Sequence, residues 1–509
     1  MDTQTCHSLL LERIALRFGA GMRKYRVPAI AGMVFGMLAY LFFFTNKLVN
    51  HDEVQCLFDK GATFSSGRWG LRILEFIFPN YSMPWLYGII TIVLITLSVC
   101  LMVSIFSIRT PLLQVLLAGT VIVFPSLIGL LAYMFTSSSY AAAFLLAVLA
   151  VWFVTRPDIR AMLPGLFCMV ASLSIYQSYV ALAAGLLVLF VIRQLLTQED
   201  VAAAVKSGVV YVLFLVISLG IYYVGTMVIN RLLGVGLSAY AGSGMSFRFS
   251  ELPQRTVLAY QSFLQFFSGY RGLLPTALSQ GLHILLFVLM GLMMLLLCRK
   301  ISLTRVLLIA VLVVILPLAV NCMYLFSDVD SVHTLVLYGF VAFYVLAVLL
   351  ADLCISKVPS SRQVLPNALS FALALIVAGN IFLANRTGLL LHLRYENAYS
   401  FYTSLVADIK MTPGFDENTK LAVIGYYREP DFYLEQFPFS DHITGTDGFL
   451  PDIYSKDRFL EYYLGFPIPM ASEAEIAEIA ASEEYAAMAR YPYYGSMQKI
   501  GDILVVKLS

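Results

Sequence analysis

The sequence has few charged residues for its length. Only 13% of its 509 residues are Asp, Glu, Lys or Arg, whereas 60% are hydrophobic. A soluble protein of this size could not cover its surface with so few charges, so the composition predicts a membrane protein. The 33 basic residues nearly balance the 31 acidic residues. The sequence therefore lacks the basic excess that is typical of nucleic-acid-binding proteins.

Cysteines are also few and scattered. None of the seven lies in a CxxC pair, and most lie within apolar runs. The sequence thus predicts neither a zinc site nor a disulfide framework, and we expect no metal and no cofactor. The pattern of a cleavable signal peptide is missing as well, because no small-residue cleavage site follows the apolar run at 27–45. This run is predicted to be the first membrane anchor.

The main feature that the sequence does contain is a series of long apolar segments. About 20 apolar residues cross a hydrocarbon core of roughly 30 Å as a helix. The predicted connections between spans at 135–138 and 177–179 are so short that a re-entrant segment is the alternative at each. The predicted fold class is a polytopic α-helical membrane protein with about eleven transmembrane helices. We place these at 27–45, 85–106, 111–135, 138–155, 161–177, 179–196, 208–230, 281–298, 304–326, 334–353 and 367–385.

Basic residues in the loops predict the orientation of the chain. The short loops on the side of the basic N-terminal segment carry Lys or Arg, whereas the opposite short loops carry none. By the positive-inside rule the N-terminus is cytoplasmic, and an odd number of spans places the C-terminus outside. Two long loops, 46–84 and 231–280, also face outside.

The chain divides into a transmembrane domain, 1–385, and an outer C-terminal domain, 386–509. In the second domain the apolar runs at 421–424 and 503–506 predict strands. Ser472, which precedes acidic residues, predicts the start of a helix. These signals fit a small extracytoplasmic α/β domain. This domain either binds glycan or only covers a site.

The predicted spans contain almost no ionisable side chains, and His283 lies at the edge of one. Ion-coupled transporters use such side chains near the bilayer midplane, where burying a charge is unfavourable and is retained only for function. The sequence therefore argues against ion-driven transport. It favours chemistry at the outer boundary between membrane and water.

The first outer loop carries two adjacent carboxylates, Asp52 and Glu53. In the structural interpretation, Asn50 and Glu53 have the spacing of a capping box. In the functional interpretation, one carboxylate removes the proton from an acceptor hydroxyl that attacks a sugar carbon, which accelerates such reactions roughly 10²- to 10⁴-fold. The two are compatible because a capped helix holds a base rigidly. We favour Asp52 as the base and Glu53 as cap or second acid, with His51 as a hydrogen-bond partner.

Other polar residues of the outer loops are candidates for binding. The segment 64–78 has the composition of an interfacial helix. Arg68 within it either binds a lipid phosphate or is solvated among headgroups. Tyr176 and Gln177 either bind sugar hydroxyls or belong to an interfacial aromatic belt. The loop 231–280 either orders around a lipid-phosphate donor or is a passive connector. The remaining candidates are the donor-phosphate ligands Arg248 and Arg271 and the substrate contact His333.

Three stretches carry a resemblance to a known family. Residues 50–53 (Asn-His-Asp-Glu), 60–70 (Lys-Gly-Ala-Thr-Phe-Ser-Ser-Gly-Arg-Trp-Gly) and 174–178 (Ser-Ile-Tyr-Gln-Ser) resemble the glucosyltransferase II family of Gtr-type bacterial enzymes. The resemblance implies a GT-C-type fold with an acidic outer catalytic loop and a polyprenyl-phosphate sugar as donor. Such enzymes transfer glucose from undecaprenyl-phosphate-glucose to a cell-surface glycan such as O-antigen, outside the bacterial cytoplasmic (inner) membrane.

The resemblance also assigns residues. Asp52 and Glu53 match the acidic motif of the family, and Arg68 and Trp69 match the run that follows it. Trp69 is accordingly a further candidate for substrate binding. Related lipid-phosphate-sugar transferases often need no metal.

Two other functions are compatible with the sequence. A flippase or carrier for lipid-linked sugars has the same topology and the same phosphate-binding arginines but needs no catalytic carboxylate. A non-catalytic scaffold that recruits partners through its C-terminal domain is the third hypothesis. Formation of a new glycosidic bond by the purified protein distinguishes the enzyme from both.

Overall fold

Long helices make up most of the protein, and a small sheet lies near its C-terminus. The computed structural model describes residues 21, 23–61, 63–198, 200–237, 249–268, 277–326, 333–357, 363–416, 418–426, 432–437, 443–446 and 455–509. All eleven ranges predicted as spans are helical. The corresponding helices are α2 Arg26–Thr45, α5 Pro84–Phe106, α6 Pro111–Ile122 with α7 Pro125–Ala132, α8 Met134–Val154, α9 Met162–Ile175, α10 Tyr179–Thr197, α11 Val201–Leu233, α14 Ala277–Cys298, α15 Leu303–Val320, η4 Thr334–Phe340 with α17 Val341–Lys357, and α18 Val364–Met411.

The number of helices long enough to cross a membrane is smaller than the eleven predicted. Among the described residues, nine helices are sufficiently long and apolar, with η4 and α17 counted together, and ten if α6 and α7 form one span. These two helices meet at an angle of 44°, because α7 begins at Pro125, which has no N–H with which to continue the helix. α9 is shorter than the other spans. The polytopic helical architecture is confirmed, and the predicted count is not.

The predicted outer loop 231–280 contains a helix that the sequence analysis missed. This helix, α13 (Leu252–Ser268), follows the short 3-10 helix η2 (Phe249–Glu251). Phe266 stacks on Phe124 between α6 and α7, with the ring centroids 5.4 Å apart. The spacing of the buried positions gives α13 one largely apolar face that packs into the bundle. These positions are Arg255, Ala259, Phe263, Phe266 and Phe267.

One carboxylate lies inside a span, contrary to the expectation that the spans are almost free of ionisable groups. Asp352 on α17 is buried. Its Oδ1 accepts hydrogen bonds from the backbone N of Thr110, at 2.9 Å, and from the hydroxyl of Thr110, at 2.7 Å. Thr110 precedes α6, whose first N–H groups have no partner within the helix. Asp352 therefore caps α6 from a neighbouring helix, where a negative charge also complements the helix dipole.

The C-terminal domain contains a three-stranded sheet with the order β1-β3-β2. Strand β3 pairs in parallel with β1 and antiparallel with β2. The predicted strands are confirmed, and Ser472 and Glu475 form the capping box of α21. The elements after α18 are β1 Lys420–Ile424, α19 Phe432–Gln436, α20 Lys456–Leu464, α21 Glu473–Ala480, α22 Glu483–Ala487, β2 Met497–Ile500 and β3 Ile503–Lys507.

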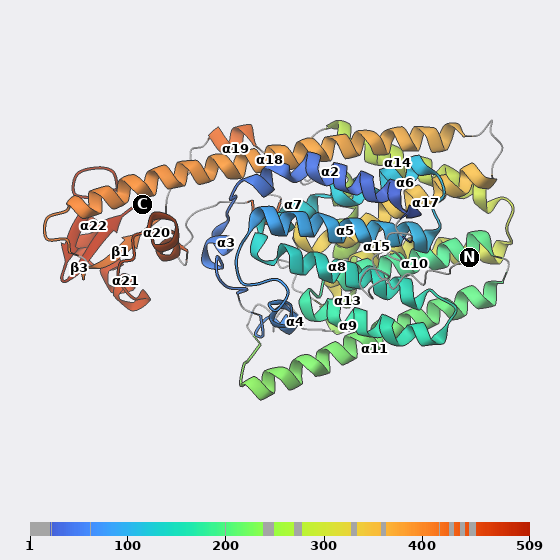
Figure 1. Cartoon of the computed structure of the whole chain (residues 1–509), viewed down its shortest axis with the longest axis horizontal. Coiled ribbons are helices and arrows are strands. Elements are labelled where there is room, and N and C mark those ends of the chain that lie inside the picture. The colour runs from blue at the N-terminus through green and yellow to red at the C-terminus, as the bar shows by residue number, and fades with distance from the viewer. Residues whose placement is uncertain are drawn as a thin grey trace, which may run out of the picture.

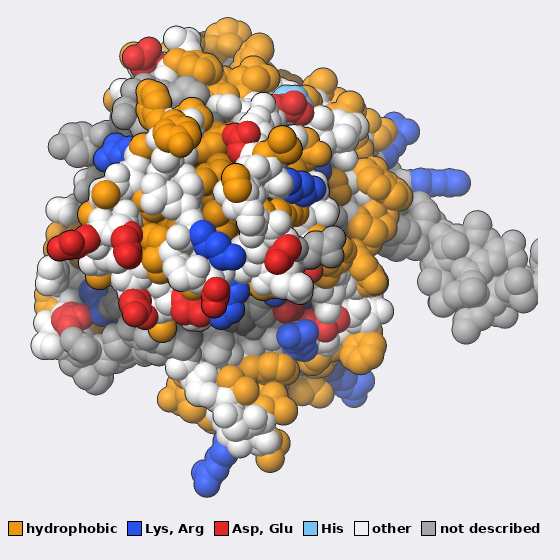
Figure 2. All heavy atoms as spheres, turned by 90° about the vertical axis from the view of Figure 1, so that its left-hand side faces the viewer, with side chains coloured by type: hydrophobic (Ala, Val, Ile, Leu, Met, Phe, Trp, Pro, Cys, Tyr) orange, Lys and Arg blue, Asp and Glu red, His pale blue; other side chains and the backbone are white. Residues whose placement is uncertain are grey.

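Helix α18 joins the two parts of the molecule without a break. It has 48 residues, which corresponds to a length of about 72 Å. Figure 1 shows α18 running along the bundle and continuing into the C-terminal domain, at the end of the bundle where α3 and α4 also lie. Viewed from this end, the surface presents acidic and basic side chains among hydrophobic ones (Figure 2). The polar loop 46–84 and the C-terminal domain thus share one end of the bundle.

The C-terminal domain packs directly on the loop 46–84. Val49 and Val54 from this loop belong to the same buried cluster as Tyr402 on α18 and Phe459 on α20. The ring of Phe58 contacts the ring of Tyr462 on α20 edge-to-face, with centroids 5.2 Å apart. The loop therefore has membrane helices on one side and a folded domain on the other.

Candidate active site

The short helix α3, His51–Gln55, carries both candidate carboxylates. Asn50 is its N-cap, as predicted, because its Oδ1 accepts a hydrogen bond from the backbone N of Glu53 at 2.8 Å. The other end of the same amide donates to the carbonyl of Ala132 at 3.0 Å. Asn50 thereby fixes α3 both to its own first turn and to the end of α7.

Glu53 is buried and has three described partners. Its side chain is fully inaccessible, and Oε1 lies 2.5 Å from Nζ of Lys47. The hydroxyl of Ser82 also donates to Oε1, and the backbone N of Phe135 donates to Oε2 at 3.1 Å. A buried carboxylate needs such compensation. The predicted capping box is therefore only half formed, because the Glu53 carboxylate bonds to other segments instead of turning back to Asn50.

Asp52 has a different environment although it is the next residue on the same helix. Its side chain is 42% exposed, and Oδ1 lies 3.8 Å from Nε2 of His51. Neighbouring residues of an α-helix point about 100° apart, so Glu53 faces the bundle while Asp52 faces outward. Of the two carboxylates, Asp52 is the one that a substrate can reach.

Lys60 belongs to this site but was not identified from the sequence. It is buried, and its ammonium donates to the carbonyl of Phe135 and lies 5.2 Å from the centre of the Tyr87 ring. Burial lowers the pKa of Lys60 to about 8, although Glu75 and Glu53 act in the opposite direction. The peptide groups of Phe135 thus bind both Glu53 and Lys60. A single lysine in a polar loop gives no signal in the sequence that it will be buried.

Arg68 lies in an aromatic cage formed by α8 and α9. Its Nη1 donates to the hydroxyl of Tyr140 at 2.9 Å, and its guanidinium lies 5.4 Å from the centre of the Tyr176 ring. The two tyrosine rings stack with centroids 4.3 Å apart. Tyr140 is five residues beyond Phe135 on α8, which is about 7.5 Å along the helix axis. The α8 residue that contacts Arg68 therefore lies further along this helix than the one that contacts Glu53.

The Ser-Gly-Arg-Trp run and the Tyr-Gln turn meet in the structure. Nε2 of Gln177 donates to the carbonyl of Ser66 at 2.9 Å and to the hydroxyl of Tyr222 at 2.8 Å. The Tyr222 hydroxyl in turn donates to the carbonyl of Gly67 at 3.1 Å. Gly67 has a φ of +72°, and a Cβ there would lie 2.6 Å from this hydroxyl. Glycine is therefore required by both backbone conformation and space.

The stretch of the chain that contains these residues matches a known protein family. The family described as Glucosyl transferase GtrII matches residues 41–346, more than half of the chain. The chain belongs to the glucosyl transferase GtrII family. The match includes the carboxylate helix, the Arg68 cage and the Gln177 turn, but it ends before α18 and the C-terminal domain. No curated protein and no solved structure matches the chain.

Membership of the GtrII family identifies a membrane protein related to glucosyltransferases. The structure also places most of the remaining candidate residues. Trp69 starts α4, Trp69–Leu74, and its Nε1 donates to the hydroxyl of Thr226 on α11 at 3.2 Å. His333 is the N-cap residue of η4. Arg248 and Arg271 lie outside the described residues. Within the described part of the chain, no three His, Cys, Asp or Glu residues are grouped closely enough to hold a metal ion.

The predicted interfacial helix at 64–78 is shorter in the structure than in the prediction. Only α4 is helical within it, and its Gly70 and Leu71 are buried. A Cβ at Gly70 would lie 2.3 Å from the hydroxyl of Ser174, so α4 sits directly on the end of α9. Beyond α4, the side chains of Phe76 and Ile77 are 93% and 67% exposed. These two side chains have the exposure expected at a membrane boundary.

Proposed function

We propose that the protein transfers a sugar, glucose by its family, from a polyprenyl-phosphate donor to a cell-surface glycan. Undecaprenyl-phosphate-glucose is the donor, and the reaction takes place at the outer face of the bacterial cytoplasmic membrane in a GT-C-type fold. The N-terminus is cytoplasmic and the C-terminus is outside. One observation carries the proposal: α3 presents an accessible Asp52 beside a buried, charge-compensated Glu53 in a member of a glucosyl transferase family.

In the proposed mechanism Asp52 is the general base. Its carboxylate takes the proton from an acceptor hydroxyl while the hydroxyl oxygen bonds to the anomeric carbon of the donor. The bond between that carbon and the phosphate oxygen breaks, and polyprenyl phosphate leaves with the bonding electrons. A carboxylate acts in this way only where it is within hydrogen-bond reach of the substrate, and the exposure of Asp52 permits such contact. Glu53 holds α3 in place, and His51 orients Asp52.

Arg68 binds the donor phosphate in this proposal. A guanidinium offers a planar fork of donors that matches phosphate oxygens, and the rings of Tyr140 and Tyr176 fix its plane. Its partner Tyr140 lies further along the apolar helix α8 than the partner of Glu53, which suits a phosphate attached to a membrane lipid. Positive charge next to the leaving phosphate stabilises the negative charge that develops as the bond breaks. Trp69, Tyr176 and Gln177 line the substrate site in this proposal. His333 is a further substrate contact, and Arg248 and Arg271, which lie outside the described residues, stay donor-phosphate candidates from the sequence alone.

The test is formation of a glycosidic bond by the full-length protein purified in detergent. The donor is undecaprenyl-phosphate-glucose with labelled glucose. The acceptor is the polysaccharide from the envelope of cells in which the gene for this protein has been deleted, because that polysaccharide lacks the modification. Labelled polysaccharide is the expected product. Movement of the donor across a vesicle membrane with no labelled polysaccharide would instead identify a carrier.

A further inference from the structure

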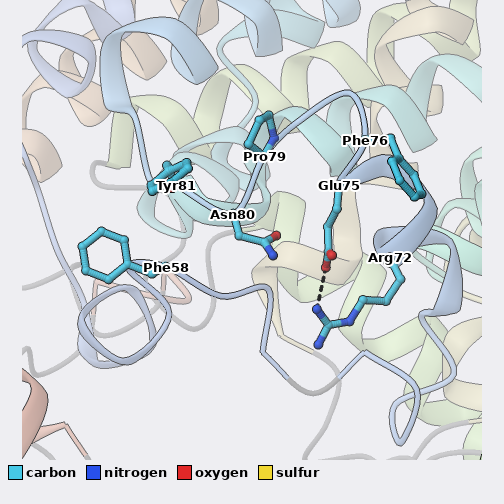
Figure 3. Close-up of a pocket in the computed structure, with 7 residues that line it drawn as sticks. All are labelled: Phe58, Arg72, Glu75, Phe76, Pro79, Asn80 and Tyr81. Carbon is cyan, nitrogen blue, oxygen red and sulfur yellow. Dashed lines mark hydrogen bonds and ion pairs between the residues drawn. The ribbon is translucent and has the colours of Figure 1, made fainter.

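A hollow of about 630 Å³ opens in the segment between α3 and α5, outside the cluster around Glu53 and the Arg68 cage. Figure 3 shows that Phe58 and Tyr81 lie on one side of it, while Arg72 and Glu75 lie on the other. Asn80 extends its amide between the two sides. The hollow therefore combines aromatic rings with polar groups that point inward.

The aromatic side of the hollow is accessible. The side chains of Phe58 and Tyr81 are 53% and 57% exposed, and their rings meet edge-to-face with centroids 6.0 Å apart. Exposed neighbouring aromatic rings in a polar surrounding are typical of binding sites for ligands that have both apolar faces and polar edges. A pyranose ring is such a ligand, because its C–H groups form apolar faces and its hydroxyls lie around its edge.

The arginine on the polar side of the hollow is paired with carboxylates, because Arg72 lies 3.8 Å from Asp59 as well as beside Glu75. Nη1 of Arg72 donates to Oε1 of Glu75 at 2.9 Å, so the positive charge is compensated within the pocket. A phosphate would compete with Glu75 for this arginine, whereas a neutral polyol needs only donors and acceptors. Arginine supplies donors, the carboxylate supplies acceptors and an asparagine amide supplies both. The balance of charge favours a neutral sugar over a phosphorylated ligand.

Asn80 gives independent evidence that the hollow is a site for a polar ligand. Its Oδ1 is buried and has no hydrogen-bond partner among the described residues. Buried amide oxygens are nearly always satisfied, and a turn of the Asn80 side chain toward the hollow would give this oxygen a partner in a bound polar ligand. Figure 3 shows the Asn80 amide at the wall of the hollow, between its aromatic and polar sides.

The hollow is joined through Ser82 to α3, the helix that carries the proposed base Asp52. The backbone N of Ser82 donates to the carbonyl of Leu57 at 3.1 Å, and its hydroxyl donates to the carboxylate of Glu53. Phe58 follows Leu57 and Tyr81 precedes Ser82, so both aromatic residues adjoin this contact. The aromatic side of the hollow is therefore built on the same loop as Asp52, and its position relative to α3 is fixed.

From these observations we infer that the hollow between Phe58, Tyr81, Asn80 and the Arg72–Glu75 pair binds a neutral hexose unit of the acceptor glycan. The aromatic rings stack on the sugar, Asn80 bonds to a hydroxyl, and the chain of the glycan leads toward Asp52. The assignment of this glycan as the acceptor rests on the proposed function. The contact between Phe58 and Tyr462 makes the C-terminal domain a neighbour of this site.

The experiment compares wild type with Asn80→Ala, Tyr81→Ala and a control, Tyr494→Ala, in which a fully exposed tyrosine of the C-terminal domain is removed. Equilibrium binding of the envelope polysaccharide from gene-deleted cells is measured with full-length protein in detergent. The transfer assay then gives KM separately for the polysaccharide and for undecaprenyl-phosphate-glucose. Each pocket variant is expected to raise the Kd and the KM for the polysaccharide about tenfold. The KM for the donor and all values for Tyr494→Ala stay unchanged.

Two results would overturn the inference, and both are separate from failure of the proposed function. The first is a wild-type protein that does not bind the polysaccharide, or pocket variants that bind it as well as wild type does. The second is a rise in the KM for the donor alone, which would make the hollow part of the donor site. Polysaccharide binding that is weakened by the pocket variants, but without any labelled product, would refute the transferase and still support a glycan site. Unfolding temperatures of all variants verify that each protein is folded.

Discussion

Neutralising the two adjacent carboxylates should affect different properties: the transfer rate for Asp52 and the stability of the fold for Glu53. Asp52→Asn is expected to lower the rate of sugar transfer roughly 10²- to 10⁴-fold, the contribution of a positioned base. It should change the free energy of unfolding by less than about 1 kcal/mol, because the Asp52 side chain is 42% exposed. Glu53→Gln should instead destabilise the protein, because Gln leaves the ammonium of Lys47 without the carboxylate 2.5 Å away.

The magnitude for Glu53→Gln follows from its contacts. A hydrogen bond to a charged group contributes about 1.5–3 kcal/mol, and removal of one partner of a fully buried pair costs about 3–5 kcal/mol. Lys47 keeps 24% of its side chain exposed, so water compensates part of its charge and the lower range applies. We expect a loss of about 2 kcal/mol. The double variant Lys47→Met/Glu53→Gln should recover part of this loss, because no unpaired ammonium remains.

The assay measures the initial rate of labelled-glucose transfer and the unfolding temperature of the same preparations. Asp59→Asn is the matched control, since Asp59 is another exposed carboxylate of this loop, with 58% of its side chain accessible. Its activity should equal that of wild type. Full activity of Asp52→Asn, or a stable Glu53→Gln protein with a 10²-fold lower rate, would refute the division of roles between the two residues.

Three further predictions follow from the surroundings of these residues. Arg68→Lys should reduce kcat/KM for the donor at least about tenfold, because a lysine ammonium lacks the planar fork; an unchanged value would exclude a phosphate contact. Lys60 has a folded-state pKa of about 8, below its ordinary value of 10.5, so the unfolded state binds more protons between these values and stability should rise from about pH 8 to about pH 10.5. In Lys60→Met this contribution should be missing, as the difference in unfolding temperature between the two proteins across that pH range will reveal. Gly67→Ala should destabilise the protein by at least about 1–2 kcal/mol, because of its φ of +72° and because the new Cβ would lie 2.6 Å from the Tyr222 hydroxyl. Gly234→Ala, at a φ of +66° in open space, gives the cost of the backbone conformation alone.

Much of the fold could be predicted because hydrophobic length is a strong local signal. Every predicted span is helical, and the capped helices after Asn50 and Ser472 start where the sequence places them. The number of spans was less predictable, because Pro125 bends one helix and α9 is short. Helix α13 was missed because its apolar face alternates with polar residues, so a search for continuous apolar windows cannot detect it.

The candidate site was predictable in its residue types but not in its division of labour. The sequence identifies an acidic pair, whereas only the fold brings Lys47, Ser82 and Phe135 to one of its members. Likewise, the pairing of Arg68 with Tyr140 depends on two residues 72 positions apart. Such long-range contacts leave no local pattern. The burial of Asp352 and Lys60 depends on the same kind of distant partner.

The unbroken course of α18 has a mechanical consequence. A single helix crosses a hydrocarbon core of roughly 30 Å and keeps about 40 Å of its length for the region beyond. If α18 stays rigid, a tilt of its membrane-spanning half displaces the C-terminal domain at its other end. That domain rests on the loop that holds Val49 and Val54. Changes in bilayer thickness that tilt α18 should therefore change the position of α3.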